Sequence, residues 1–107
     1  RNYHVFYQLL RGLSAEDCAA SYLDVLEMEQ LRLVNQSGCT TIDGVDDGAD
    51  LQKTREAMAA IDMGEEERHQ VLRTLAAVLL LAQLEFDQER GGGGKGGEAL
   101  AESGHCK

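Results

Sequence analysis

The glycine-rich stretch near the end of the sequence holds the residues most suggestive of chemistry. Residues 91–97 are all glycine except Lys95, and glycines beside a lysine are typical of phosphate-binding loops of the form G-x-x-x-x-G-K-[ST]. Gly94 and Lys95 fit the last glycine and the lysine. Glu89, however, stands at the first glycine position, and Gly96 replaces the hydroxyl residue that holds magnesium. The stretch therefore predicts a flexible surface loop, because glycine loses the most conformational freedom on ordering.

An acidic stretch at residues 43–50 resembles the start of a calcium-binding loop. With Asp43 at position one of such a loop, Asp47 falls at position five. Position three is Val45 and position twelve is Thr54, so the bidentate glutamate that completes a calcium site is missing. The stretch predicts a turn followed by a helix cap.

The cysteines and histidines are too scattered to predict a site. They are Cys18, Cys39, Cys106, His4, His69 and His105. The sequence has no Cys-x-x-Cys pair, so free thiols in a reducing compartment fit better than a tetrahedral metal site. No serine or cysteine has a recognisable base nearby in the sequence. Residue types and spacing therefore predict no catalytic, cofactor-binding or metal-binding residue in this chain.

The charge balance narrows the range of partners. The 107 residues carry a formal net charge of −9, which repels both the phosphates of nucleic acids and anionic membrane surfaces. Residues 1–10 lack the uninterrupted apolar core of a signal peptide. The most apolar run, residues 75–82, is much shorter than the roughly 20 residues that span a bilayer. We expect a cytoplasmic protein that binds neither nucleic acid nor membrane.

The first predicted helix begins near residue 2, where Asn2 can act as its cap. Its expected apolar face has the spacing i, i+3, i+4 and i+7 and consists of Tyr3, Phe6, Tyr7 and Leu10. Arg11 suits the negative end of this helix, and Gly12 is expected to terminate it.

Capping residues place two further helices. Ser14 can accept a backbone N–H at the start of the second helix, whose incomplete apolar stripe leaves its end undefined. Turn residues dominate residues 35–48. Asp46 or Asp47 is then expected to cap a third helix that ends near Gly64.

The fourth predicted helix is the longest and loses its polar face halfway along. Residues 65–67 are glutamates, which suit its positive N-terminal end. After Gln70 the apolar residues cover its whole circumference: Val71, Leu72, Leu75, Ala76, Ala77, Val78, Leu79, Leu80, Leu81 and Ala82. A helix that is apolar on all sides must be surrounded by protein. Three short helices cannot cover it, so we expect this chain to be an internal piece of a larger protein.

Four strings of residues follow one another in a distinctive order. Residues 1–10 read RNYHVFYQLL, residues 35–47 read NQSGCTTIDGVDD, residues 54–58 read TREAM and residues 75–86 read LAAVLLLAQLEF. They resemble, in the family's own order, the segments RNYHIFYQLL, NQSGC..IDGVDD, TREAM and LAAILHLGNIEF of the myosin head, in the form found in many unconventional myosins. The motif residues that the resemblance marks as structural are Asn2, Tyr3, His4, Phe6, Asn35, Gly38, Asp43, Gly44, Asp46 and Asp47.

The resemblance implies a mainly α fold. About four helices would come from the upper subdomain of a P-loop motor head, between switch I and switch II. Residues 1–90 would be the partial motor-like helical segment and residues 91–107 a flexible Gly-rich surface loop. Leu80, Ala82 and Gln83 depart from the family's usual His, Gly and Asn, which affects packing details rather than the family assignment.

The resemblance also implies a parent activity, that of an ATP-driven, actin-based cytoskeletal motor. ATP and magnesium would bind outside this chain, which has no GESGAGKT, NxNSSRFGK or DIxGFE string, so the chain alone is expected to be inactive. Its job would be structural, as part of the wall of the actin-binding cleft. Glu89, Arg90 and Lys95 would lie on a surface loop that reaches toward the actin filament. The alternative is a free-standing, non-enzymatic helical interaction module or the remnant of a truncated gene.

Overall fold

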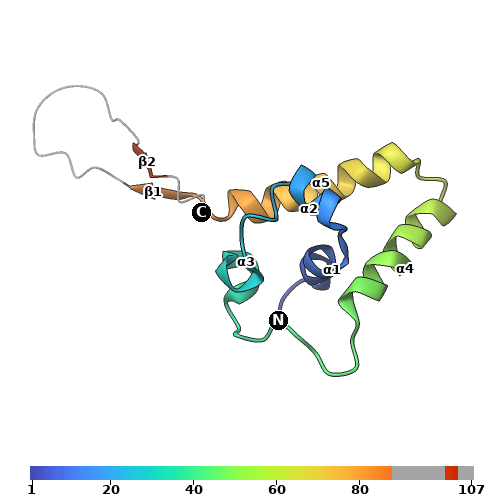
Figure 1. The fold of residues 1–107 in the computed structure, drawn as a ribbon, viewed down its shortest axis with the longest axis horizontal. Helices are drawn as coiled ribbons and strands as arrows, with labels where there is room; N and C mark the ends of the chain where they lie inside the picture. The colour runs from blue at the N-terminus through green and yellow to red at the C-terminus, as the bar shows by residue number, and fades with distance from the viewer. Residues whose placement is uncertain (88–100, 104–107) are drawn as a thin grey trace, which may run out of the picture.

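The computed structural model describes residues 1–87 and 101–103, and this part of the chain is mainly helical, as predicted (Figure 1). Its elements are α1 (His4–Gly12), α2 (Ala15–Ala20), the short 3₁₀ helix η1 (Met28–Gln30), α3 (Arg32–Asn35), α4 (Asp47–Ala60), α5 (Glu65–Leu81), β1 (Glu85–Asp87) and β2 (Ala101–Ser103). Most of the predicted Gly-rich loop, residues 91–107, lies outside the described residues.

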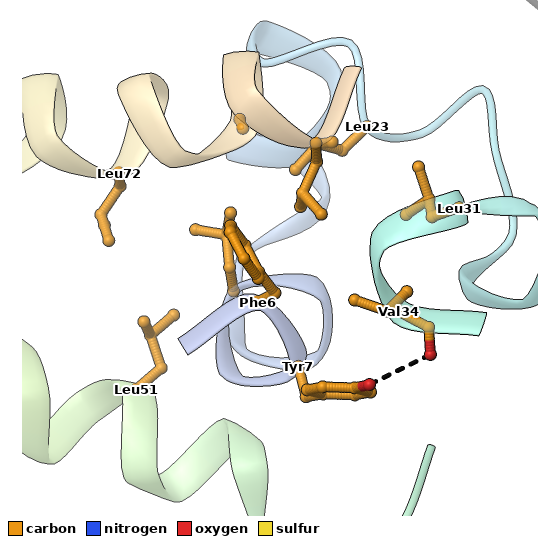
Figure 2. Packing of buried hydrophobic residues seen from close by; sticks show 10 residues of the cluster. Phe6, Tyr7, Leu23, Leu31, Val34, Leu51 and Leu72 are labelled. Carbon is orange, nitrogen blue, oxygen red and sulfur yellow. Dashed lines mark hydrogen bonds between the residues drawn. The ribbon is translucent and has the colours of Figure 1, made fainter. Parts of the chain in front are cut away.

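Helix α1 lies at the centre of the helical body, with α3, α4 and α5 arranged around it (Figures 1 and 2). The buried apolar residues come from all of these helices and from the segment after α2: Phe6, Tyr7, Leu9, Leu23, Leu31, Val34, Leu51, Leu72, Ala76 and Leu79. The predicted face of the first helix is right for Phe6 and Tyr7 and wrong for Tyr3, which is 75% exposed. Leu9 is fully buried instead, because α1 is enclosed on more than one side.

Both ends of α1 differ from the sequence prediction. The side chain of Asn2 does not cap the helix, which begins after Tyr3 with no side-chain cap. The Asn2 amide instead donates a hydrogen bond to the carbonyl oxygen of Leu33 in α3. Gly12 is the last residue of α1, and a Cβ atom there would lie 2.7 Å from the Cβ of Leu51. This glycine allows α1 and α4 to approach each other closely.

The predicted caps of α2 and α4 are confirmed. The Ser14 hydroxyl accepts a hydrogen bond from the backbone N–H of Asp17 at 3.1 Å. The carboxylate of Asp46 accepts one from the backbone N–H of Ala49 at 2.9 Å. Each cap satisfies a donor that has no partner within its own helix. Asp47, the alternative cap, is the first residue inside α4.

Helix α5 buries only one face of its apolar half. Leu72, Ala76 and Leu79 are buried against the other helices. Val78 is 41% exposed and Leu81 is 62% exposed. The other described elements therefore leave part of this helix uncovered, as the sequence pattern predicts.

Strands β1 and β2 form an antiparallel pair in which Phe86 lies opposite Glu102. The pair extends away from the helical body beyond the end of α5 (Figure 1). Phe86 is 64% exposed. Among the described residues, no helix is both long and apolar enough to cross a membrane.

Candidate functional site

The turn between α3 and α4 brings the family-like string at residues 35–47 to the string at residues 1–10. Gly38 and Gly44 adopt positive φ angles of 65° and 78°. Residues that have a Cβ atom adopt this left-handed backbone conformation only at a cost in free energy. Asp43 is exposed beside the second of these glycines. The two reversals return the chain toward α1, and Asp47 follows directly at the start of α4.

Asp47 is a buried carboxylate held between two arginines. Its side chain is 2% exposed. Arg1 Nη2 donates to Asp47 Oδ1 at 2.6 Å, and Arg1 Nη1 donates to Oδ2 at 2.9 Å. Arg11 Nη1 donates to the same Oδ2 at 2.7 Å. We call Arg1, Arg11 and Asp47 the arginine–aspartate cluster; it joins both ends of α1 to the start of α4.

The arginines determine the charge state of this carboxylate. The hydrogen bond from Arg1 lowers the pKa of Asp47, burial opposes that change, and the hydrogen bond from Arg11 lowers the pKa further. The hydrogen bond to Asp47 is in turn the main reason why the pKa of Arg1 is raised. These shifts keep Asp47 and Arg1 charged at neutral pH.

Further contacts hold the Arg1 guanidinium in place. It lies over the ring of Tyr7, with its central carbon 4.3 Å from the ring centroid, at a distance typical of a cation–π contact. One of its nitrogens lies 3.0 Å from His4 Nδ1. The carbonyl oxygen of Thr40 accepts hydrogen bonds from Arg1 at 3.0 Å and from Arg11 at 2.6 Å. The cluster thus also fixes the turn before α4.

Hydrogen bonds join α3 to α1, and join α3 and η1 to the segment after α5. The buried Tyr7 hydroxyl donates to the carbonyl oxygen of Val34 at 3.0 Å (Figure 2). The side-chain oxygen of Gln83 accepts from the backbone N–H of Arg32 at 2.7 Å, and its amide nitrogen donates to the carbonyl oxygen of Gln30 at 2.9 Å. Gln83 therefore positions the residues that lead into β1.

This arrangement fixes structure and is not suited to acid–base chemistry. Asp47 accepts three hydrogen bonds from charged donors and stays ionised, so its lone pairs are not available to take a proton from a substrate. Among the described residues, no group of three or more His, Cys, Asp or Glu side chains could hold a metal ion.

The residues marked by the resemblance are motif residues, which the structure describes, and charged loop residues, which it does not. Asn2, His4 and Asp47 contact α3 or the arginines, while Asn35 donates to the carbonyl oxygen of Glu29 at 2.9 Å. Phe6 is buried and meets the exposed Tyr3 ring edge-to-face at 6.3 Å. The predicted loop residues lie outside the described part of the chain: Glu89, Arg90 and Lys95.

Sequence reasoning did not identify the partners of Asp47. Arg1 had no assigned role, and Arg11 was expected only to stabilise the end of its helix. Arg1 and Arg11 are 46 and 36 residues from Asp47 in the sequence, so no local spacing links them. The residue type was the one available signal, because a buried aspartate at the start of a helix needs a cationic partner.

Comparison with known proteins gives one family. Residues 1–103 match the family model described as "Myosin head (motor domain)". The chain is 38% identical over 100 residues to "Myosin heavy chain IB" of Acanthamoeba castellanii, a match covering 94% of this chain and 8% of that protein. It is 35% identical over 97 residues to "Myosin IA heavy chain" of Dictyostelium discoideum, covering 88% of this chain and 10% of that protein.

A third relative is also a myosin heavy chain. The chain is 40% identical over 91 residues to "Myosin-J heavy chain" of Dictyostelium discoideum, covering 85% of this chain and 4% of that protein. The chain thus spans a tenth or less of the length of these relatives.

Proposed function

The chain belongs to the myosin head (motor domain) family, and from that membership we propose that it is a structural part of an ATP-driven, actin-based motor. In this proposal residues 1–90 are the helical segment and residues 91–107 a surface loop. The segment forms part of the wall of the actin-binding cleft, and it does not hydrolyse ATP when it is separated from the rest of the head.

The observation that carries the proposal is the uncovered face of the apolar half of α5. Val78 and Leu81 expose apolar surface that the other described helices do not cover. Burying such surface against another part of a protein lowers the free energy of the folded state. The rest of a motor head would provide that burial. A free-standing helical module would leave the same side chains in water, so this feature does not favour the alternative.

ATP and magnesium are assigned to other parts of the head. Phosphoryl transfer needs donors around the phosphates and oxygen ligands for magnesium. The described residues do not fit that requirement, since they contain no metal-binding group of acidic or histidine side chains. No catalytic step is therefore assigned to residues of this chain.

The proposed partners are the actin filament and the remainder of the head, in a cytoplasmic, cytoskeleton-associated protein. Glu89, Arg90 and Lys95 are the charged residues we propose to face actin, on the loop that follows β1. The arginine–aspartate cluster supports this role indirectly. It stiffens the connection between α1 and α4, which lets the segment move as one body when the head changes state.

Substitution in the complete motor tests this proposal. Leu81→Asp places a carboxylate on the face that the rest of the head would cover, and an unpaired buried charge is costly. We expect actin-activated ATP hydrolysis and actin co-sedimentation of the protein containing this chain to fall by more than about tenfold. Gln70→Asp, on an exposed position of the same helix, is the matched control and should change little. Normal actin-dependent activity with Leu81→Asp would contradict the proposal.

A further inference from the structure

The connection between α5 and β1 is short and has a regular backbone. Ala82, Gln83 and Leu84 separate the two elements. The N–H of Gln83 donates to the carbonyl oxygen of Leu80 at 3.0 Å, and the N–H of Leu84 donates to that of Leu81 at 3.1 Å. These bonds have the spacing of a 3₁₀ turn, which often ends an α-helix. This turn therefore sets the direction in which β1 leaves the helical body.

The Gln83 side chain caps α3, although Gln83 and Arg32 are 51 residues apart in the sequence. Leu31, at the N-cap position of α3, provides no side-chain hydrogen bond, and the first N–H groups of a helix have no partner within it. The side-chain oxygen of Gln83 accepts a hydrogen bond from the N–H of Arg32, the first residue of α3, at 2.7 Å. Its amide nitrogen donates to the carbonyl oxygen of Gln30 in η1 at 2.9 Å. One side chain thus uses both its donor and its acceptor at the junction of η1 and α3.

An ion pair joins α3 to β1 directly beside this cap. The Arg32 guanidinium pairs with the carboxylate of Glu85, the first residue of β1. Both side chains are partly exposed, and an isolated ion pair of this kind is worth about 1 kcal/mol or less. The pair therefore adds to the hydrogen bonds of Gln83 rather than replacing them. Together they hold the start of β1 to α3 at two adjacent points.

Helix α3 is a firm support for these contacts because it is anchored in the core. Leu31 and Val34 are buried. The carbonyl oxygen of Val34 accepts a hydrogen bond from the buried Tyr7 hydroxyl, and that of Leu33 accepts one from the Asn2 amide. A strand held to α3 is therefore held in place relative to α1 and the core.

From these contacts we propose that Gln83 is a positioning residue for actin binding. It holds the start of β1 against α3, so that the loop that follows β1 begins from a fixed place. This role rests on the proposed function, which assigns that loop to the actin filament, and it adds a determinant that lies outside the loop. Fixing the base of a binding segment in advance lowers the ordering cost of binding and raises affinity.

Replacing Gln83 by methionine in the complete motor that contains this chain tests this role. Gln83→Met keeps the length of the side chain and removes its amide, so neither hydrogen bond to η1 or α3 can form. Actin-activated ATP hydrolysis is measured over a range of actin concentrations. We expect the actin concentration for half-maximal activity to rise about fivefold, while the maximal rate at saturating actin stays the same. Gln70→Met, at an exposed position of α5, is the matched control and should behave like the parent.

A charge exchange distinguishes positioning from a direct contact with actin. Arg32→Glu places two carboxylates opposite each other, and we expect the half-maximal actin concentration to rise about threefold. Adding Glu85→Arg restores an opposite-charge pair with its members exchanged, so the value should return close to that of the parent. A double variant that is as impaired as Arg32→Glu would show that the Arg32 side chain acts on actin itself, and would overturn the positioning role.

Hydrogen exchange reports on the cap without relying on motor activity. In the complete motor, the backbone amide of Arg32 should exchange faster in Gln83→Met than in the parent, because it loses its acceptor. Unchanged exchange at Arg32 would overturn the role of Gln83. Faster exchange with an unchanged half-maximal actin concentration would overturn it too, because the cap would then support α3 alone.

A loop variant separates failure of this role from failure of the proposed function. It carries Glu89→Gln, Arg90→Gln and Lys95→Gln together and tests the actin-facing loop directly. If this variant raises the half-maximal actin concentration and Gln83→Met does not, the proposed function stands and the positioning role fails. If the loop variant behaves like the parent, the actin-facing loop fails and the positioning role fails with it.

Discussion

The arginine–aspartate cluster and the apolar half of α5 differ in what the chain supplies to them. At the cluster, the buried carboxylate of Asp47 finds both of its cationic partners within the same 107 residues. In α5, Leu79 is fully buried while Leu81, two residues further on, is 62% exposed. Among the described residues the Asp47 carboxylate therefore has its partners, whereas the apolar side chains of α5 are covered only in part. What the segment needs from outside is apolar surface, which is what a neighbouring part of a larger head would provide.

The largest effect is expected from Asp47→Ala. This substitution leaves the buried Arg1 without its counter-charge and also removes the partner of the partly exposed Arg11. Breaking a buried pair in this way costs about 3–5 kcal/mol of unfolding free energy. Urea denaturation of the 107-residue chain, followed by circular dichroism, measures the change. Asp43→Ala removes an exposed carboxylate and should cost about 0.5 kcal/mol or less. Equal effects of the two substitutions would show that the cluster does not stabilise the chain.

A pair of substitutions in α5 compares its covered and uncovered faces. Leu79→Ala creates a cavity in the core and should cost about 2–5 kcal/mol in the isolated chain. Leu81→Ala should cost about 0.5 kcal/mol or less there, because that side chain is exposed. In the complete motor head the cost of Leu81→Ala should rise toward that of Leu79→Ala. If Leu81→Ala is as costly as Leu79→Ala in the isolated chain, the comparison fails.

Gly12→Ala tests how closely α1 and α4 approach each other. The added methyl group would lie 2.7 Å from the Leu51 Cβ, and overpacking of this kind costs about 1–3 kcal/mol. Thermal unfolding gives the change in stability. Gly64→Ala is the control, because a Cβ atom there meets nothing within 4 Å. A Gly12→Ala chain that melts at the parent temperature would contradict the packing described for α1 and α4.

Acid titration should have a smaller effect than Asp47→Ala, because a protonated Asp47 loses its charge but its carboxyl group can still accept hydrogen bonds from the arginines. The pKa of Asp47 is lower in the folded chain than in the unfolded one. Its contribution to stability is therefore present above the unfolded pKa of about 4, and is lost as the pH falls through the folded value. Comparison of the parent chain with Asp47→Asn below pH 4 measures this contribution. Identical pH dependence in the two proteins would contradict it.

Local signals in the sequence predicted much of the fold. The Ser14 and Asp46 caps are correct because a cap depends on residues a few positions away. The exposed face of α5 follows from its apolar circumference. Asn2 was wrongly assigned as a cap because its actual partner, the carbonyl of Leu33, is 31 residues away.

The remaining features depend on contacts that spacing does not encode. The pairing of Asp47 with Arg1 and Arg11 needs the turn at Gly38 and Gly44 and the crossing of α1 with α4. Gly12 resembles a helix terminator in sequence, and only the packed structure places it against Leu51. The predicted roles of Glu89, Arg90 and Lys95 fall outside the described residues and stay predictions.

Hydrogen exchange of α5 tests most directly whether its apolar half is built for a larger body. Amide exchange of residues 71–84 would be measured by mass spectrometry in the 107-residue chain and in the complete motor head, with residues 47–60 of α4 as an internal reference. We predict that exchange in residues 71–84 slows by more than about tenfold in the complete head, and by more than in the reference. Equal protection of residues 71–84 in the two proteins would contradict this account.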